Sequence, residues 1–284
     1  EMQRSLVGSE MCIRDRFYRN RQEGDMKRFM MSDIHGFYEA FETALNKVDF
    51  SGENQLFLLG DYIDYGPDSR KVLEKIKALQ EIYGSQKVIT LLGNHEKALL
   101  DWLEEYADIN RHICGVEQYR DAEWLLSDAD GDYGTLRSFL SARHFWEFTE
   151  KEARLSGDSK NAEAVRMLLE DAGELLAWMR HFPYYYETER QILVHAGIAE
   201  WAGEDWLCVT SEELMVGKTT ASRGNFYKDV IAGHISTAKI SGDRTYDGIW
   251  SDGCSHYYLD GTTWRSGKIP VLEYDAETGR YRER

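Results

Sequence analysis

Short apolar runs alternate with helix-like segments along the chain from Met26 onward. The pattern predicts strands over 27–32, 55–60 and 87–92, with helices over 37–48 and 68–83 between them and another helix from about residue 95. Within 68–83, apolar residues recur at i, i+3 and i+4, which is typical of a helix that covers one face of a sheet. Strands and helices that alternate in this order predict an α/β fold with parallel strands.

The rest of the chain has two further patterns. Residues 97–182 carry Trp, Leu and charged residues at helical spacing, and we expect a helical insertion within a single domain that spans 26–284. After the insertion, short apolar runs separated by Gly, Asp and Ser predict a mostly antiparallel sheet. These runs lie at 191–194, 229–232, 247–250, 256–260 and 269–274.

Residues 1–25 differ from the rest of the chain because they show no hydrophobic periodicity. The stretch from Ser5 to Arg16, SLVGSEMCIRDR, resembles translated sequencing-adapter text. We therefore expect this leader to be foreign to the protein and disordered, and we leave it out of the fold prediction.

Composition narrows the classes of partner. A net charge of −16 disfavours a nucleic-acid partner, because nucleic-acid backbones attract basic surfaces. No apolar run approaches the roughly 18–20 residues of a membrane span, and no secretory leader pattern opens the chain. We expect a cytoplasmic protein without a membrane partner. The four cysteines form no CxxC pair, which argues against a thiolate zinc site.

Polar residues with metal-binding side chains follow the predicted strands. Four of the eight histidines stand at or just after a strand and beside a glycine, where strand ends of an α/β sheet converge on one crevice. A set of merely hydrogen-bonded polar groups would give these carboxylates and imidazoles no reason to converge. Their oxygen and nitrogen donors suit Mn²⁺, Fe or Zn²⁺. The predicted ligands are Asp33, His35, Asp61, Asn94, His195 and His234.

Five short motifs occur in a fixed order: SDIHG (32–36), GDYIDYG (60–66), GNHE (93–96), HAG (195–197) and GH (233–234). Over roughly residues 26–275, this series resembles the calcineurin-like metallophosphoesterases, in particular the bacterial serine/threonine phosphoprotein phosphatases. The resemblance implies a mixed β-sandwich flanked by helices, with a dinuclear metal site at the strand ends.

The resemblance also implies a role for each matching residue. Asp33 and His35 would hold the first metal ion, Asp61 would bridge both ions, and the second ion would be held by Asn94, His195 and His234. His95 would be the general acid, oriented by Asp64. With two divalent ions, Mn²⁺ first and Fe or Zn²⁺ as alternatives, a bridging hydroxide would attack the phosphate ester.

Besides Ser32, which replaces the opening glycine of the first family motif, two positions that would contact the substrate depart from the family pattern. Tyr65 replaces the arginine that grips the substrate phosphate with a planar fork. The second family arginine aligns with Lys218, although a plain surface lysine is an equal alternative there, and Arg223 is the other candidate. We treat all three residues as candidate substrate-binding residues. Tyr65, flanked by Tyr62, would offer an aromatic face to an aryl or nucleoside group.

Three functions remain open at this point. The leading one is a phosphatase that acts on a phosphorylated protein or a small phosphomonoester. The second is a dinucleoside polyphosphate or nucleotide hydrolase, because those enzymes share the metal motifs. The third is a catalytically weak, metal-binding regulatory protein, suggested by the lost arginine. The presence of His95 and Asp64 argues against the third, because a pure binder has no use for a leaving-group acid.

The role of Tyr65 can be tested by restoring the arginine. We expect Tyr65→Arg to raise kcat/KM for p-nitrophenyl phosphate, since a guanidinium binds phosphate through two charge-assisted hydrogen bonds. Steady-state kinetics with added Mn²⁺ measures the change. Unchanged kinetics would argue against any substrate role for Tyr65.

Overall fold

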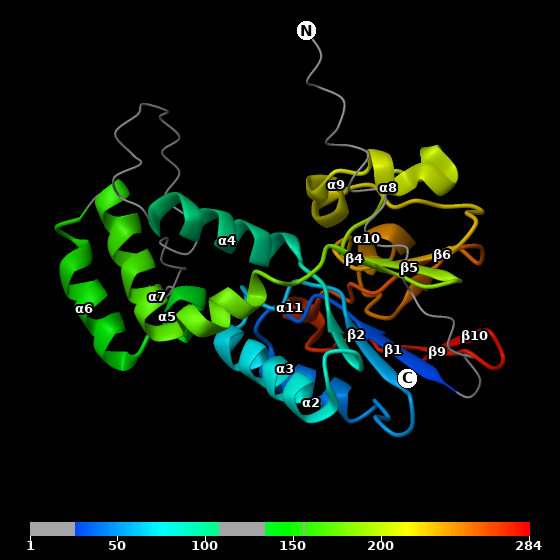
Figure 1. Ribbon diagram of the computed structural model, residues 1–284, viewed down its shortest axis with the longest axis horizontal. Helices are drawn as coiled ribbons and strands as arrows, with labels where there is room; N and C mark the ends of the chain where they lie inside the picture. Colours follow the sequence, from blue (N-terminus) through cyan, green and yellow to red (C-terminus); the bar gives the residue numbers. More distant parts are fainter. Residues whose placement is uncertain (1–25, 108–133, 156) are drawn as a thin grey trace, which may run out of the picture.

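The computed structural model describes residues 26–107, 134–155 and 157–284. Two five-stranded sheets pack face to face, helices lie on their outer faces, and a lobe of helices extends from one end (Figure 1). The strand order is β10-β9-β1-β2-β3 in the first sheet and β4-β5-β6-β8-β7 in the second. This confirms the predicted mixed β-sandwich flanked by helices. The leader prediction lies outside the described residues.

The first sheet contains the strands that the apolar runs predicted near the start of the chain. β1, β2 and β3 are parallel, and β9 and β10 extend the sheet beside β1 in antiparallel pairs. Helices α2 (Tyr38–Leu45) and α3 (Ser69–Tyr83) connect the parallel strands and cover the outer face. The strand bounds are β1 Lys27–Met31, β2 Gln55–Leu58, β3 Val88–Thr90, β9 Leu272–Asp275 and β10 Arg280–Glu283.

Helix α3 has the buried face that its periodicity predicted. Val72, Leu73 and Ile76 are fully buried. Asp68 occupies the N-cap position without a side-chain capping bond, and Gly84 ends the helix with a φ of 91°. A positive φ at the residue after a helix favours glycine, which has no Cβ to clash.

The second sheet corrects a prediction. Its central strands β5, β6 and β8 are parallel, and only the outer strands β4 and β7 are antiparallel to their neighbours, so the expectation of a mostly antiparallel sheet is wrong. The run at 269–274 also joins the first sheet, as part of β9. The bounds are β4 Tyr185–Glu187, β5 Gln191–Val194, β6 Asp229–Ala232, β7 Trp250–Ser251 and β8 His256–Tyr258.

The connections between these strands explain the correction. The segment between β5 and β6 contains η3 (Glu200–Asp205), α8 (Trp206–Val209) and α9 (Glu212–Gly217), and α10 (Thr237–Ser241) lies between β6 and β8. Such crossovers return the chain to the same end of the sheet, which makes consecutive strands parallel. Buried strands are apolar on both faces in either direction, so the runs themselves did not reveal strand polarity.

The two sheets meet in an apolar layer. Met30 and Phe57 of the first sheet pack in one buried cluster with Leu193 and Ile231 of the second. The buried Arg28 guanidinium donates a hydrogen bond to Gln191 Oε1 at 2.8 Å, which adds a polar link between the sheets. This packing brings the carboxyl ends of both sets of parallel strands to the same edge of the sandwich (Figure 1).

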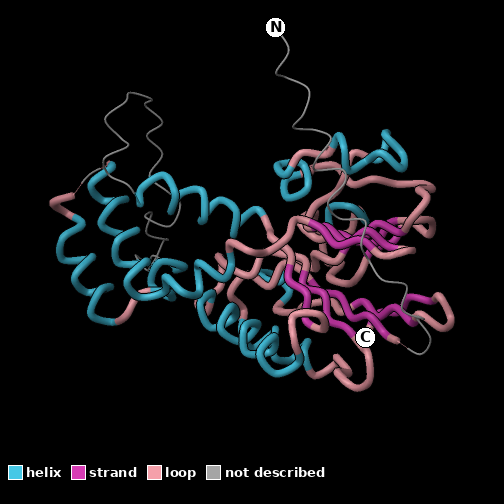
Figure 2. Tube along the Cα trace, viewed as in Figure 1, coloured by secondary structure: helices cyan, strands magenta, loops and turns pink. Residues whose placement is uncertain are grey.

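The described residues of the insertion form helices, drawn in cyan at one end of the molecule in Figure 2. They are α4 (Asn94–Ala107), α5 (Gly134–Phe139), α6 (Ala142–Glu152) and α7 (Asp158–Met179). Trp102 in α4 donates a buried hydrogen bond to Asn161 in α7 at 2.8 Å, which ties these two helices together. Among the described helices, none has the length and apolar character needed to cross a bilayer.

Candidate metal centre

All six predicted metal ligands lie at the carboxyl ends of parallel strands. Asp33 and His35 follow β1, Asp61 follows β2, and Asn94 begins α4 after β3. The last two ligands come from the second sheet, where His195 follows β5 and His234 follows β6. The site is therefore assembled from both sheets of the sandwich.

Asp61 stands at the middle of the ligand set. Its Oδ2 lies 3.7 Å from Nε2 of His35 and 3.9 Å from Nε2 of His95, and its Oδ1 lies 3.3 Å from Nε2 of His195. Donor atoms of His35, Asp61 and His95 lie within 4.8 Å of one another, as do those of Asp61, His195 and His234. Two groups that share one carboxylate fit a dinuclear centre with Asp61 as the bridge.

The remaining two ligands border these groups. Asp33 Oδ1 lies 3.9 Å from His35 Nε2, and its carboxylate accepts the backbone N–H of His234 at 3.0 Å. Asn94 Oδ1 lies 2.9 Å from His195 Nε2. The donor set consists of imidazole nitrogens, carboxylate oxygens and one amide oxygen, which fits the divalent ions expected from the sequence. The assignment of each side chain to one of two ions stays a prediction.

Backbone carbonyls orient two of the histidines. Nδ1 of His35 lies 2.9 Å from the Ile63 carbonyl oxygen, and Nδ1 of His195 lies 2.8 Å from that of Leu59. An imidazole that donates its Nδ1–H to a carbonyl presents an unprotonated Nε2 to a metal ion. In both rings Nε2 faces Asp61.

His95 is held differently, by a carboxylate. Its Nδ1 lies 2.5 Å from Asp64 Oδ2, and Asp64 also accepts a hydrogen bond from the hydroxyl of Thr135 in α5. Burial alone would lower the pKa of His95, but the bond to Asp64 and the charge of Asp61 raise it to about 9. The predicted pair of His95 and Asp64 is thus in direct contact, and a helix of the insertion supports it.

Burial and mutual repulsion shape the electrostatics of the ligands. Burial raises the pKa of Asp33 and lowers that of His35, and burial with the nearby His195 lowers the pKa of His234 to about 4. Burial would also raise the pKa of Asp61, but the neighbouring histidines, His195 first, hold it well below its ordinary value. A bound divalent cation would favour the deprotonated form of every one of these ligands.

The backbone is strained where the ligands stand. Of seven non-glycine residues with positive φ in the described part of the chain, six belong to this site: Asp33, His35, Asp61, Asp64, Tyr65 and His234. Such conformations cost on the order of 1–3 kcal/mol each and persist only where the surroundings enforce them.

Glu96 holds the loop after β2 in its conformation. The sequence interpretation gave this residue no role. Its buried carboxylate accepts the backbone N–H groups of Asp61, Tyr62, Ile63 and Gly93 at 2.7–3.1 Å. The signal was present in the sequence, because Glu96 is the last residue of the GNHE motif. A fully buried glutamate needs several donors, and the ligand loop supplies them.

Close backbone approach explains two motif glycines. A Cβ at Gly93 would lie 2.3 Å from Asp61 Oδ1, and a Cβ at Gly233 would lie 2.2 Å from Asp33 Oδ2. Any side chain at either position would displace a predicted ligand. The glycines of GNHE and GH therefore make room for the metal-binding carboxylates.

The three candidate substrate residues lie in different surroundings. The exposed Tyr65 ring is 4.7 Å from the His35 ring and 5.5 Å from the His95 ring, so it lies at the mouth of the centre. Lys218 packs along Gly197, and its ammonium donates to Ile198 O at 2.8 Å and to Ser222 Oγ at 2.7 Å. The Arg223 guanidinium donates to the carbonyl of Ile240 and lies over the Trp250 ring.

Lys218 also belongs to a network of charged side chains around the buried His256. Lys218 Nζ lies 3.4 Å from Glu200 Oε1, and Glu200 Oε2 lies 2.8 Å from Nε2 of the buried His256. Nδ1 of the same ring lies 2.8 Å from Asp252 Oδ2. Burial alone would lower the pKa of His256, but the two carboxylates raise it. The ammonium of Lys218 is thus committed to this network, and its predicted substrate role stays a prediction, as does that of Arg223.

The chain matches the model of a protein family described as calcineurin-like phosphoesterase over residues 26–261. Two curated relatives are named symmetrical bis(5'-nucleosyl)-tetraphosphatase. The one from Erwinia tasmaniensis is 39% identical over 200 residues, or 69% of this chain and 54% of the relative. The one from Delftia acidovorans is 40% identical over 195 residues, or 66% of this chain and 50% of the relative. The chain thus spans about half the length of these two relatives.

A solved structure shares the fold. The cold-active protein-tyrosine phosphatase of a psychrophilic Shewanella species superposes with a TM-score of 0.52 at 16% identity, covering 91% of this chain and 82% of that one. At this identity the likeness concerns the fold alone.

The role of Glu96 can be tested with Glu96→Gln. An amide offers one acceptor oxygen and turns an NH₂ group toward backbone donors, so we expect unfolding free energy to fall by at least about 2 kcal/mol. We also expect Mn²⁺ affinity to fall by about 10–100-fold, as when a support of metal ligands is lost. Urea unfolding and calorimetric titration measure the two effects.

Glu74→Gln serves as the matched control for this prediction. Glu74 is half exposed on α3 and pairs with Arg70 one helical turn away. Exposed pairs of this kind contribute about 0.3–0.5 kcal/mol, so the control should remain close to the unsubstituted protein. Equal behaviour of the two variants would exclude the structural role of Glu96.

His256 predicts a dependence of stability on pH. Because folding raises its pKa above the ordinary value of 6.5, its stabilisation is complete below that value and is lost as pH rises through the folded-state pKa. Glu200 and Asp252 face the ring, with Lys218 and Asp229 beyond them.

The test compares thermal unfolding of the unsubstituted protein and His256→Gln over a pH series that begins below the ordinary histidine pKa of 6.5 and continues into the alkaline range. We expect the difference in Tm to be largest at the acidic end and to shrink as pH rises. His181→Gln is the control, since that exposed ring contacts the Ala177 carbonyl. A difference in Tm that stays constant for His256→Gln would show that the carboxylates do not stabilise an imidazolium.

Proposed function

Since the chain belongs to the calcineurin-like phosphoesterases, we propose that it hydrolyses dinucleoside polyphosphates at the centre built around Asp61. The names of the relatives from Erwinia tasmaniensis and Delftia acidovorans support this substrate class. They favour it over the phosphoprotein or small phosphomonoester that the motifs alone placed first. The observation that carries a hydrolytic function is the pair of donor groups that share Asp61, one of which includes His95, the histidine held by Asp64.

We assign the ions as the sequence predicted. Asp33 and His35 would hold one divalent ion, Asp61 both, and the other would be held by Asn94, His195 and His234. Mn²⁺ is our first choice, with Fe and Zn²⁺ as alternatives. When bound, two such ions lower the pKa of a water molecule and neutralise charge on the phosphate oxygens.

His95 supplies the proton that the departing phosphate oxygen needs. Its Nδ1–H donates to the Asp64 carboxylate, and this orientation turns Nε2 toward Asp61. Asp64 and Thr135 fix the ring, so the proton donor stays at one place relative to the ligands. Acid catalysis by a positioned histidine contributes about 10²–10⁴-fold to a rate.

The mouth of the centre suits a nucleoside. Tyr65 is 68% exposed, Trp264 of α11 (Thr263–Ser266) is 57% exposed, and their rings lie 6.5 Å apart at an interplanar angle of 29°. Two exposed aromatic faces beside the catalytic histidine offer stacking surface for a base, worth about 1–3 kcal/mol per base. A phosphomonoester without an aromatic group would make no use of this surface.

The proposal predicts Mn²⁺-dependent cleavage of diadenosine tetraphosphate by the full chain, with ADP as the only nucleotide product and no turnover in EDTA. Chromatography of the nucleotides measures it, beside p-nitrophenyl phosphate and phosphoserine and phosphotyrosine peptides. We expect His95→Asn to lose about 10²–10⁴-fold in kcat, because the acid is removed.

The alternatives have distinct outcomes in this assay. Turnover of the phosphoserine peptide without cleavage of diadenosine tetraphosphate would restore the phosphoprotein reading. Absence of turnover on every substrate, with Mn²⁺ binding demonstrated by calorimetry, would favour the metal-binding regulatory protein.

A further inference from the structure

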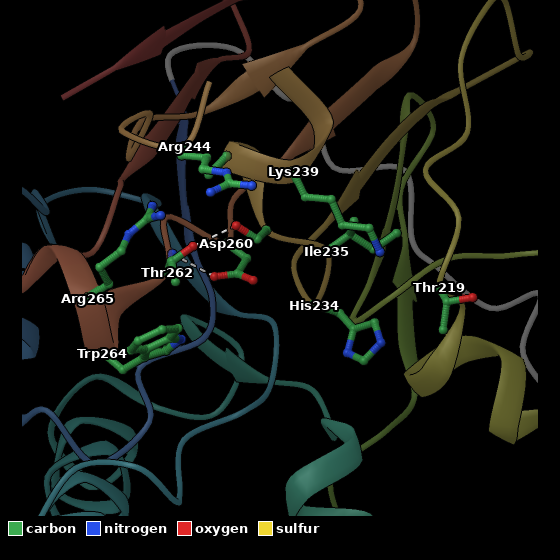
Figure 3. A pocket seen from close by; sticks show the side chains of 11 residues that line it. Thr219, His234, Ile235, Lys239, Arg244, Asp260, Thr262, Trp264 and Arg265 are labelled. Carbon is green, nitrogen blue, oxygen red and sulfur yellow. Dashed lines mark hydrogen bonds between the residues drawn. The ribbon is translucent and has the colours of Figure 1, made fainter. Parts of the chain in front are cut away.

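A pocket of about 540 Å³ opens beside His234, the last metal ligand in the chain. Apart from Thr219, which precedes β6, its lining residues follow β6 and β8, and of these only His234 belongs to one of the five motifs. Figure 3 shows Arg265, Arg244 and Lys239 along one border, with Trp264 and His234 along the opposite border. The pocket therefore continues from the metal centre and from the aromatic mouth formed by Tyr65 and Trp264.

Three cations line this pocket without acidic partners. Within the residues that the structure describes, Lys239, Arg244 and Arg265 form no ion pair within 4.0 Å. Arg265 makes only a long contact, 3.4 Å, to the carbonyl of Tyr246. All three side chains are exposed. In a chain with a net charge of −16, a group of unpaired cations at one place indicates a site for an anion.

The acidic residue on the pocket wall is already engaged. Asp260 accepts the backbone N–H of Thr262 at 2.7 Å, and its carbonyl accepts the N–H of Thr237 at 2.9 Å. These bonds hold the turn after β8, where Thr262 has a φ of 57°. Asp260 thus shapes the wall from which Trp264 and Arg265 project, and its charge acts on Arg265 from beyond ion-pair distance.

We propose that this pocket binds the phosphates of the nucleoside diphosphate half that lies beyond the cleaved bond, through Lys239, Arg244 and Arg265. This inference rests on the proposed function. His234 belongs both to the predicted ligand set and to the pocket lining, so a polyphosphate with one phosphate at the metal centre would extend its next phosphates into this pocket. The pocket cations supply positive charge in a chain that has Tyr65 where the family has an arginine, and charge-assisted bonds to phosphate oxygens are strong.

The binding test uses ADP with EDTA present, so that metal ions do not contribute. We expect the double variant Lys239→Gln, Arg244→Gln to weaken the Kd for ADP by at least about tenfold, measured by calorimetry, since two charge-assisted contacts are lost. The matched control is Arg280→Gln, which removes an exposed arginine on β10 and should leave the Kd unchanged. Adenosine is titrated beside ADP. Thermal unfolding checks that each variant is folded.

Three results would overturn the inference: failure of the unsubstituted protein to bind ADP, an unchanged Kd in the double variant, or an equal loss of affinity for adenosine. In kinetics, we expect the double variant to lower kcat/KM for diadenosine tetraphosphate relative to kcat/KM for p-nitrophenyl phosphate by about tenfold. If the unsubstituted protein does not cleave diadenosine tetraphosphate, the proposed function fails, while the ADP titrations still decide whether the pocket binds a nucleoside diphosphate.

Discussion

A single buried carboxylate organises the ligand loop on which the rest of the centre depends. Glu96 receives four backbone N–H groups, three of them from consecutive residues that begin at Asp61. Three successive N–H groups can point at one carboxylate only if the chain turns sharply, and Asp61 has the positive φ that such a turn requires. Charge-assisted hydrogen bonds of about 1.5–3 kcal/mol each are of the size needed to hold this strain. The position of Asp61 in both donor groups is therefore a consequence of where Glu96 lies.

The centre also links the two sheets through hydrogen bonds. His195 of the second sheet bonds through Nδ1 to the Leu59 carbonyl of the first, and the N–H of His234 bonds to Asp33. Gly233 lies close enough to Asp33 that a side chain could not be accommodated. Asp61 lies close to histidines from both sheets. The ligand set is therefore complete only when the two sheets pack together. Metal binding would then strengthen the contact between the sheets, because it favours the state in which all ligands are together.

The sequence predicted the parts of this arrangement that depend on local pattern. Apolar runs located β1, β2, β3, β5 and β6, and the motifs placed the predicted metal ligands after them. Strand direction in the second sheet was predicted wrongly, because a buried strand looks the same in either direction and only the crossovers decide. The GNHE motif contains Glu96, but its role was missed because three of its partners are backbone N–H groups of another loop, which the motif does not identify. Thr135 was missed as a support of Asp64 because it comes from a distant helix.

The positions of the positively charged side chains around the centre indicate which kind of substrate the centre fits. A family arginine next to His95 would hold the phosphate under attack, and in this chain an exposed tyrosine stands there. Positive charge is found instead in the pocket beside His234, at Lys239, Arg244 and Arg265. A phosphomonoester whose single phosphate lay between the predicted metal ligands would have no second phosphate to place there. Under the proposed function, a substrate with several phosphates would span both places and would recover at a distance the attraction that is missing next to the reacting group. Binding energy from parts of a substrate that do not react can be used to position the part that does. The shift of charge away from the reacting phosphate therefore favours an extended polyanion over a compact one.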